Sequence, residues 1–361
     1  DRMESIGRYC EEAILFLEKM ITIPSLSFEE ADRAAFIAEY LSKRSLKPQL
    51  VGNNIIVRLP HSSNGRPALM LNSHIDTIKP SELYTFDPFN PPLEKERILG
   101  VGSNDAGGSV TSLLHTFLYF AENKEQLKSL KVEPILVLTA EEERSGPDGM
   151  HRISAEMPDL ADMAIVGEPT GMRAAIAERG LLVIDATARG VSGHAARNDG
   201  ENAILIALDD ISILRNFVFE KISPTMGNTH LNVTQINAGT AHNVIPDECS
   251  YVVDIRPTDV YTNPEIMEIL QKRLRSTLKA RNLTNRSSAA PIGHPLLKAA
   301  ESCSMEKIIS PTTSDWMRLK IPAIKMGPGE SSRSHKADEY ILKEEIRHAI
   351  HTYIKFITHL K

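Results

Sequence analysis

This 361-residue sequence has no surplus of positive charge, no long apolar run and few cysteines, and each of these features argues against a class of protein. Lys and Arg number 41 against 47 Asp and Glu, so the formal net charge is -6. A chain with no basic surplus cannot neutralise many phosphates, which argues against a nucleic-acid partner and against a polybasic membrane anchor. No apolar run approaches the roughly 20 residues that span a bilayer. The N-terminus lacks a basic segment followed by an apolar one, so we expect no signal peptide.

The sequence holds three cysteines, Cys10, Cys249 and Cys303. Their odd number and wide spacing fit neither a disulfide framework nor a paired-cysteine metal or redox motif. We expect free thiols in a reducing compartment, which predicts a cytoplasmic protein.

Strands and helices are expected to alternate along the first half of the chain. Apolar runs predict strands at 54–59, 68–71, 134–139 and 162–166, and helical spacing predicts helices at 4–20, 29–45 and 108–123. This order predicts an α/β fold, with a mixed, mostly parallel sheet and helices on both of its faces. The pattern returns late in the chain, with helices expected at 294–303 and 343–358.

The middle of the chain follows a different pattern. Alternating polar and apolar residues predict strands at 181–188, 229–236 and 248–256, and helices are expected at 202–216 and 264–280. This order is typical of an α+β sandwich with four strands and two helices, of about 110 residues. We therefore expect a catalytic domain of residues 1–180 and 291–361, interrupted by an inserted domain of residues 181–290.

A histidine and an acid follow the second expected strand. His74 and Asp76 are two residues apart, a spacing that places side chains on one face of a strand. The carboxyl ends of strands are where open α/β sheets place their sites. A His that binds a metal is commonly oriented by a nearby carboxylate, so this pair is suited to a metal site. Most isolated His-x-Asp pairs, however, are structural.

Glycines flank one acid in the loop of residues 100–108, which reads Gly-Val-Gly-Ser-Asn-Asp-Ala-Gly-Gly. A phosphate cradle is one interpretation, but the order fits neither the P-loop nor the dinucleotide fingerprint. The alternative is that a tight backbone holds Asp105, whose carboxylate could then bridge two cations.

Acids also follow the next two strands, and a late His completes the set. Glu141, Glu142 and Glu143 come after one strand and Glu168 after the other, while His335 ends a Gly- and Ser-rich loop. A solvated charge run is the ordinary interpretation of such acids, but packing like charges at the end of a core strand is costly without cations. Nitrogen and oxygen ligands without thiolate suit a catalytic zinc, cobalt or manganese site. We expect two divalent metals, with zinc first among them.

In this order the motifs resemble those of the M20 metallopeptidase family, which includes acetylornithine deacetylase, succinyl-diaminopimelate desuccinylase and aminoacylases. The resemblance covers essentially the whole chain. It implies His74, Asp105 and Glu168 on one metal, and Asp105, Glu143 and His335 on the other. It further implies that Asp76 supports His74 and that Glu142 is the general base. Glu141 aligns with the family's usual Asp, and a slip of one residue would exchange base and ligand.

The resemblance also gives the inserted segment a role as a lid and dimerisation domain. His194, in Gly-Val-Ser-Gly-His-Ala, matches the His that reaches the partner subunit's active site in a homodimer. Asn243 and Arg256 match substrate-contacting positions, with Arg256 suited to the α-carboxylate of an amino acid. Arg333 and Arg179 are candidates for the second carboxylate of a succinyl group.

One departure marks a divergent branch: Ala106-Gly107-Gly108 stands where many relatives have Met-Lys-Gly after the Asp. The branch resembles acetylornithine deacetylase-like proteins of arginine biosynthesis, which act on N-acetyl or N-succinyl derivatives of ornithine or citrulline. A succinyl-diaminopimelate desuccinylase and an M20 dipeptidase or aminoacylase are the alternatives within the class. Outside it stand a non-catalytic binding protein, which would not need Glu142, and a nucleotide-binding protein, which would need a Lys and a hydroxyl after the glycines.

Overall fold

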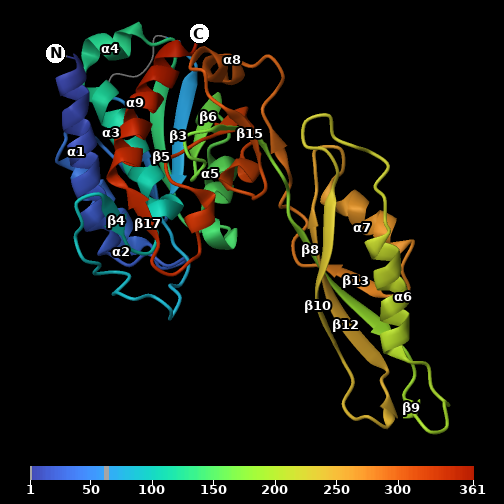
Figure 1. The fold of residues 1–361 in the computed structure, drawn as a ribbon. Helices are drawn as coiled ribbons and strands as arrows, with labels where there is room; N and C mark the ends of the chain where they lie inside the picture. The colour runs from blue at the N-terminus through green and yellow to red at the C-terminus, as the bar shows by residue number, and fades with distance from the viewer. Residues whose placement is uncertain (1, 61–64) are drawn as a thin grey trace. The chain divides into compact units, whose positions relative to one another are not determined.

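The computed structural model describes residues 2–60 and 65–361 (Figure 1). The chain divides into two compact units, one of Asp1–Ile176, Ala289–Ile308 and Ser314–Lys361, the other of Ala177–Ser288 and Ile309–Thr313. The α-helices are α1 (Arg2–Ile21), α2 (Ala31–Ser42), α3 (Gly108–Glu122), α4 (Lys124–Ser129), α5 (Met150–Glu156), α6 (Ala203–Arg215), α7 (Asn263–Gln271), α8 (Pro295–Ser302) and α9 (Lys343–His359).

The strands are β1 (Gln49–Val51), β2 (Asn54–Val57), β3 (Ala68–His74), β4 (Arg97–Leu99), β5 (Glu133–Thr139), β6 (Met163–Gly167), β7 (Ala174–Glu178), β8 (Leu182–Arg189), β9 (Gly193–His194), β10 (His230–Ala238), β11 (Val244–Ile245), β12 (Glu248–Arg256), β13 (Thr277–Ala280), β14 (Ser288–Ala289), β15 (Lys307–Ser310), β16 (Ala323–Lys325) and β17 (Tyr340–Leu342). The short helical turns of the described residues are η1 (Ser103–Gly107), η2 (Glu142–Arg144), η3 (Asp315–Arg318) and η4 (Ser331–Arg333).

A mixed sheet forms the centre of the first unit. Its strand order is β1-β2-β5-β3-β6-β16-β7-β14, and β15 pairs with β7. The central strands β5, β3, β6 and β16 are parallel to one another, whereas β2 and β7 run antiparallel to their neighbours. The prediction of a mixed, mostly parallel sheet is confirmed. The carboxyl ends of β3, β5 and β6 consequently meet at one edge, which is where the predicted ligands stand.

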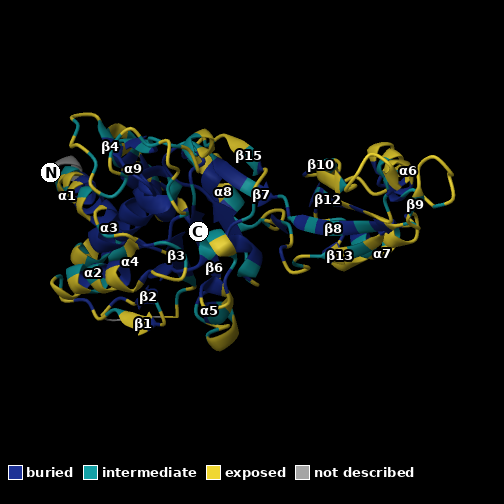
Figure 2. Ribbon diagram, turned by 90° about the horizontal axis from the view of Figure 1, so that it is seen from below, coloured by how far each residue is buried: buried dark blue, intermediate teal, exposed yellow. Residues whose placement is uncertain are grey.

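Helices cover both faces of this sheet, as predicted. The helices α1, α3 and α9 pack beside one another on one face, and α3 is buried along almost its whole length (Figures 1 and 2). Alternate residues of a strand point to opposite faces. Leu71 accordingly joins the core beneath α3, while Met70 joins the core that contains Met150 and Ile153 of α5.

The second unit is an antiparallel sheet of order β10-β12-β8-β13 that packs against α6 and α7. Four strands and two helices are what the sequence predicts for the insertion. The predicted helix at 264–280 is wrong in its second half, because α7 ends at Gln271 and β13 follows. The buried carboxylate of Asp210 accepts hydrogen bonds from the backbone N–H groups of Arg275 and Ser276, which turns the chain out of the helix.

The described residues bear on two expectations, the absence of a membrane-spanning helix and the free state of the cysteines. None of the helices in the described residues combines the length and the apolar character needed to cross a membrane. Cys10, Cys249 and Cys303 are all free thiols.

Candidate metal centre

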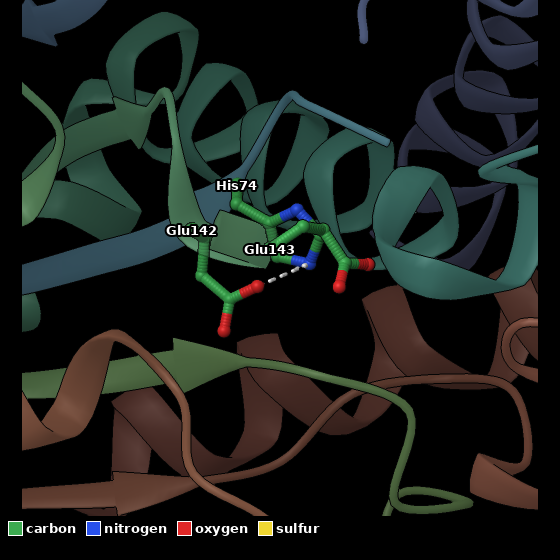
Figure 3. Close-up of side chains that lie close together, drawn as sticks. All are labelled: His74, Glu142 and Glu143. Atoms are coloured by element: carbon green, nitrogen blue, oxygen red, sulfur yellow. Dashed lines mark ion pairs between the residues drawn. The ribbon is translucent and has the colours of Figure 1, made fainter. Parts of the chain in front are cut away.

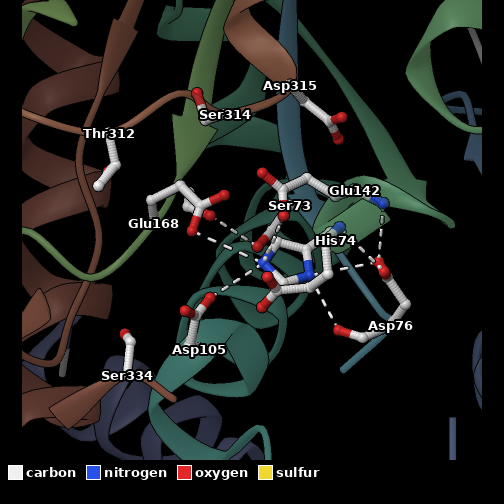
Figure 4. Close-up of polar contacts among 12 residues, drawn as sticks. Ser73, His74, Asp76, Asp105, Glu142, Glu168, Thr312, Ser314, Asp315 and Ser334 are labelled. Atoms are coloured by element: carbon white, nitrogen blue, oxygen red, sulfur yellow. Dashed lines mark hydrogen bonds and ion pairs between the residues drawn. The ribbon is translucent and has the colours of Figure 1, made fainter. Parts of the chain in front are cut away.

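His74 is the last residue of β3, and its imidazole is buried between Asp76 on one side and three acids on the other (Figure 4). Nδ1 lies 2.9 Å from the backbone oxygen of Asp76 and 3.4 Å from its carboxylate. Nε2 lies 3.1 Å from Asp105, 3.5 Å from Glu142 and 3.6 Å from Glu168. Burial opposes the charged imidazole, but the Glu142 and Glu168 carboxylates raise the pKa of His74 well above its ordinary value. With Nδ1 occupied by Asp76, Nε2 is the nitrogen available to a metal.

Asp105 stands between two histidines, in the irregular turn η1 that precedes α3. Its oxygens lie 3.1 Å from His74 Nε2 and 3.5 Å from His335 Nε2. Gly102 adopts a φ of 79°, and a Cβ at Gly107 would strike the carbonyl oxygen of Gly102. The two glycines therefore permit a turn too tight for other residues, and this turn directs the Asp105 carboxylate between both imidazoles. Burial opposes ionisation of Asp105, yet His74 and His335 lower its pKa.

The three consecutive acids after β5 separate into different environments. Glu141 has a φ of 60° and points away from the centre, where its side chain accepts a hydrogen bond from the Asp148 N–H at 2.9 Å. The turn η2 then directs Glu142 and Glu143 to different sides of His74 (Figure 3). Glu142 faces His74, whereas Glu143 lies 3.0 Å from Nε2 of His335. Of the three acids, two face the centre and one is structural.

The electrostatics of these acids reflect crowding of like charge. Burial raises the pKa of Glu142 well above its usual range, and Glu168 and Glu143 raise it further against the opposing effect of His74. Burial and the charge of Asp105 raise the pKa of Glu143 to about 7. The Glu143 hydrogen bond is the largest influence on His335, whose pKa rises to about 9. Carboxylates packed this closely require protons or cations for compensation.

Among the described residues, three groups of His, Asp and Glu side chains have ligand atoms within 4.8 Å of one another. They are His74, Asp105 and Glu168; Asp105, Glu143 and His335; and His74, Glu142 and Glu143. The first two share Asp105 and together use all five predicted ligands. Imidazole and carboxylate donors without thiolate fit divalent zinc, cobalt or manganese.

Asp315 also belongs to this site, and sequence reasoning missed it. It is 5% exposed and accepts a hydrogen bond of 2.5 Å from the Thr139 hydroxyl at the end of β5. Its negative charge adds to the raised pKa of Glu142, and burial raises its own pKa to about 7. No strand leads directly into this residue, so the strand-then-acid pattern that marks Glu168 is missing at Asp315.

The predicted substrate-contacting residues have partners other than the five predicted ligands. Arg333 donates to both oxygens of Glu345, at 2.8 and 3.0 Å, and Arg256 donates to both oxygens of Asp254, at 2.7 and 3.0 Å. Arg179 donates to the backbone oxygens of Met226 and Asn228. The exposed His194 and Asn243 belong to neighbouring segments of the second unit, where the Asn243 oxygen accepts the Ala195 N–H at 3.0 Å.

Models of two peptidase families match separate parts of this chain. Residues 176–282 match the peptidase dimerisation domain of the M20 type, and residues 54–168 match peptidase family M28. The chain is 27% identical to an acetylornithine deacetylase of Myxococcus xanthus over 81% of its length and 80% of the relative's. It is 25% identical to a succinyl-diaminopimelate desuccinylase of Pelagibacter ubique, covering 74% of this chain and 73% of that one.

A dinuclear metal-binding peptidase of the M20 family from Bacillus subtilis has the same fold, with a TM-score of 0.72, 15% identity and 98% of each chain covered. Fold, site and relatives together define a metal-dependent hydrolase. The chain is similar to M20 metallopeptidases in its dimerisation segment and across its relatives, which is the resemblance that its motifs indicate.

Proposed function

We propose that the protein is a two-metal amidohydrolase that removes an acyl group from the α-nitrogen of an amino acid. The observation that carries this proposal is the sharing of Asp105 by two ligand groups. His74 and Glu168 complete one metal site, and Glu143 and His335 complete the other. Two divalent ions would supply the positive charge that the crowded carboxylates require. Zinc is the metal we expect, with cobalt or manganese as alternatives.

Glu142 is the general base of this proposal. The two ligand groups are complete without it, although it lies only 3.5 Å from the ligand His74. When bound, the metals would polarise the amide carbonyl and make water a better nucleophile. Glu142 takes the proton of the attacking water and delivers it to the leaving amine. Asp76 holds the base in place, because its carboxylate accepts the backbone N–H of Glu142 at 3.1 Å.

The substrate we propose is an N-acyl derivative of ornithine or citrulline, which would place the enzyme in arginine biosynthesis. The names of several relatives support this choice, and the desuccinylase among them supports an acyl-diaminopimelate as the alternative. A dipeptide or another N-acyl amino acid is the third possibility. Arg256 would bind the α-carboxylate by a bidentate contact, which requires it to share or leave Asp254.

We further propose a cytoplasmic homodimer that assembles through residues 181–290. The strand β10 is an edge of its sheet, and such an edge offers unpaired backbone groups to a second chain. Leu205 and Leu208 of α6 and Ile236 of β10 are large apolar side chains left exposed. In the dimer, His194 of each chain would donate to the oxyanion that develops in the partner's site, a contribution of about 3–4 kcal/mol.

The test has two parts. Metal analysis of protein purified without chelator, followed by back-titration with zinc, should approach two ions per chain. The zinc-loaded enzyme is then incubated with N-acetylornithine, N-acetylcitrulline, N-succinylcitrulline and N-succinyl-diaminopimelate. A chain that binds no metal would refute the two-metal centre. Metal binding without hydrolysis of any acyl compound would leave the dipeptidase alternative, which a dipeptide panel tests directly.

A further inference from the structure

Among the described residues, one arginine is buried next to the segment that carries His74 and Asp76. Arg33, on α2, is 2% exposed and belongs to none of the sequence motifs. Its Nη1 donates to the carbonyl oxygen of Ile75 at 3.0 Å, and its Nε and Nη2 donate to that of Ile23 at 3.1 and 2.8 Å. Ile75 is the residue between His74 and Asp76. The guanidinium therefore holds the backbone of the His-x-Asp segment at the residue between the two side chains.

The partners of Arg33 are carbonyl oxygens, although two buried acids lie near it. Burial lowers the pKa of Arg33 to about 10, and the charges of Asp76 and Glu339 oppose that effect. A buried cation that forms no ion pair is costly, and the negative charge of Asp76 compensates part of that cost. Because the guanidinium bonds to backbone, it occupies no carboxylate oxygen of the centre.

Asp76 and Glu339 use their oxygens to hold the backbone of other ligand-bearing segments. Asp76 accepts the N–H groups of Glu142 and Glu143, both at 3.1 Å. Glu339 is 2% exposed and accepts the N–H groups of Asn104 at 2.8 Å and Asp105 at 3.0 Å. The two acids thus fix the segments that carry three of the site's carboxylates, and the charge of Arg33 stabilises both.

We propose that Arg33 is a positioning residue of the metal centre. It anchors the His74–Asp76 segment through its hydrogen bond to the Ile75 carbonyl. It also places a fixed positive charge near Asp76 and Glu339. This inference rests on the proposed two-metal function. It predicts that removal of the guanidinium loosens His74 and weakens metal binding, although removing a positive charge would by itself strengthen the binding of cations.

The experiment compares three variants with the wild type. Arg33→Met removes charge and hydrogen bonds, and Arg33→Lys keeps the charge but loses the planar fork that bonds to two carbonyls. Arg66→Met is the matched control, because Arg66 also donates to two carbonyl oxygens, those of Leu127 at 2.8 Å and Leu130 at 3.0 Å. Arg66 precedes β3, at the opposite end of that strand from His74. Zinc affinity is measured by competition with a chelator, and folding of each metal-free protein by near-ultraviolet circular dichroism.

Both Arg33 variants should bind zinc about 10–100-fold more weakly than the wild type, as changes behind metal ligands generally do. Arg66→Met should match the wild type. Unchanged affinity in the Arg33 variants, or tighter binding by Arg33→Met, would overturn the proposal. Failure of both Arg33 variants to fold without metal would overturn it too, because Arg33 would then be a general structural residue. A wild type that binds no zinc would instead refute the proposed function.

Discussion

The carboxylate of Asp76 accepts the backbone N–H of Glu142 at 3.1 Å, which joins two motifs 66 residues apart in sequence. The same carboxylate lies 3.4 Å from Nδ1 of His74. One acid therefore orients both a proposed ligand and the proposed base. Any displacement of Asp76 should change the distance between His74 and Glu142, now 3.5 Å, on which the proposed proton transfer depends.

Glu142→Ala should reduce kcat by about 10²–10⁴-fold while zinc content stays that of the wild type, because a base is removed and the ligands remain. Glu143→Ala should instead lose zinc, since Glu143 completes the group with Asp105 and His335. The measurements are steady-state kinetics on the best acyl substrate and metal analysis after dialysis.

Glu141→Ala is the internal control for this pair. Its side chain accepts the Asp148 N–H and faces away from the centre, so the variant should keep its zinc and lose stability instead. If Glu142→Ala lost zinc and Glu143→Ala kept it, the roles of the two acids would have to be exchanged.

His115 should make the protein less stable in mild acid. This α3 residue is buried, bonded to the Tyr40 hydroxyl at 2.8 Å and to the Thr111 carbonyl at 2.8 Å, and burial lowers its pKa to about 3. The unfolded chain, with a His pKa near 6.5, takes up the proton first. The stabilising contribution is therefore complete above about pH 6.5 and falls by about 1.4 kcal/mol per pH unit as the pH drops towards 3.

Urea unfolding of metal-free protein at pH 7, 6 and 5 measures this effect. His115→Gln should remove that part of the slope, whereas His151→Gln, at an exposed position of α5, should follow the wild type. Other titrating groups are common to the three proteins and cancel in the comparison. Parallel curves for wild type and His115→Gln would contradict the prediction.

The sequence predicts the fold well because its signals are local. The apolar runs that become β3, β5 and β6 are buried whichever neighbours they pair with, and the acids that follow them meet because parallel strands end together. The helix predicted through residue 280 failed for the opposite reason. There the deciding contact is with Asp210, more than 60 residues earlier, and no local propensity reports it.

The residues that support the site could not be predicted from the sequence for a similar reason. The sequence suggests that His74 and Asp76 share a strand face, but β3 ends at His74, and the Asp76 carboxylate lies 3.4 Å from Nδ1 of that histidine. Glu339 and Arg33 act through backbone groups of distant segments, which leave no mark in the sequence around them. The division among the three consecutive acids depends on the left-handed conformation of Glu141, which an acidic run does not indicate.

If His194 acts in the partner's site, two subunits that carry different inactivating substitutions should complement each other. His194→Ala and Glu142→Ala homodimers should each be nearly inactive. After mixing, a heterodimer holds one site with an intact base and an intact His, so activity should recover towards about a quarter of the wild-type value for random exchange. Subunit exchange is followed with two affinity tags. Confirmed exchange with no recovered activity would refute a role for His194 in the partner's site.

The acyl group can be tested through the two arginines proposed to bind a distal carboxylate. They differ in their present partners, since Arg333 is paired with Glu345 while Arg179 donates to backbone oxygens. Burial lowers the pKa of the Arg179 guanidinium. If the substrate is succinylated, Arg179→Ala should lower the ratio of kcat/KM for succinyl over acetyl compounds by about 10-fold or more, because the distal carboxylate loses its charge partner. Arg333→Ala should change this ratio less, because its guanidinium already binds an acid. Preference for the acetyl compound in the wild type, with the ratio unchanged in both variants, would refute the succinyl hypothesis and leave deacetylation as the activity.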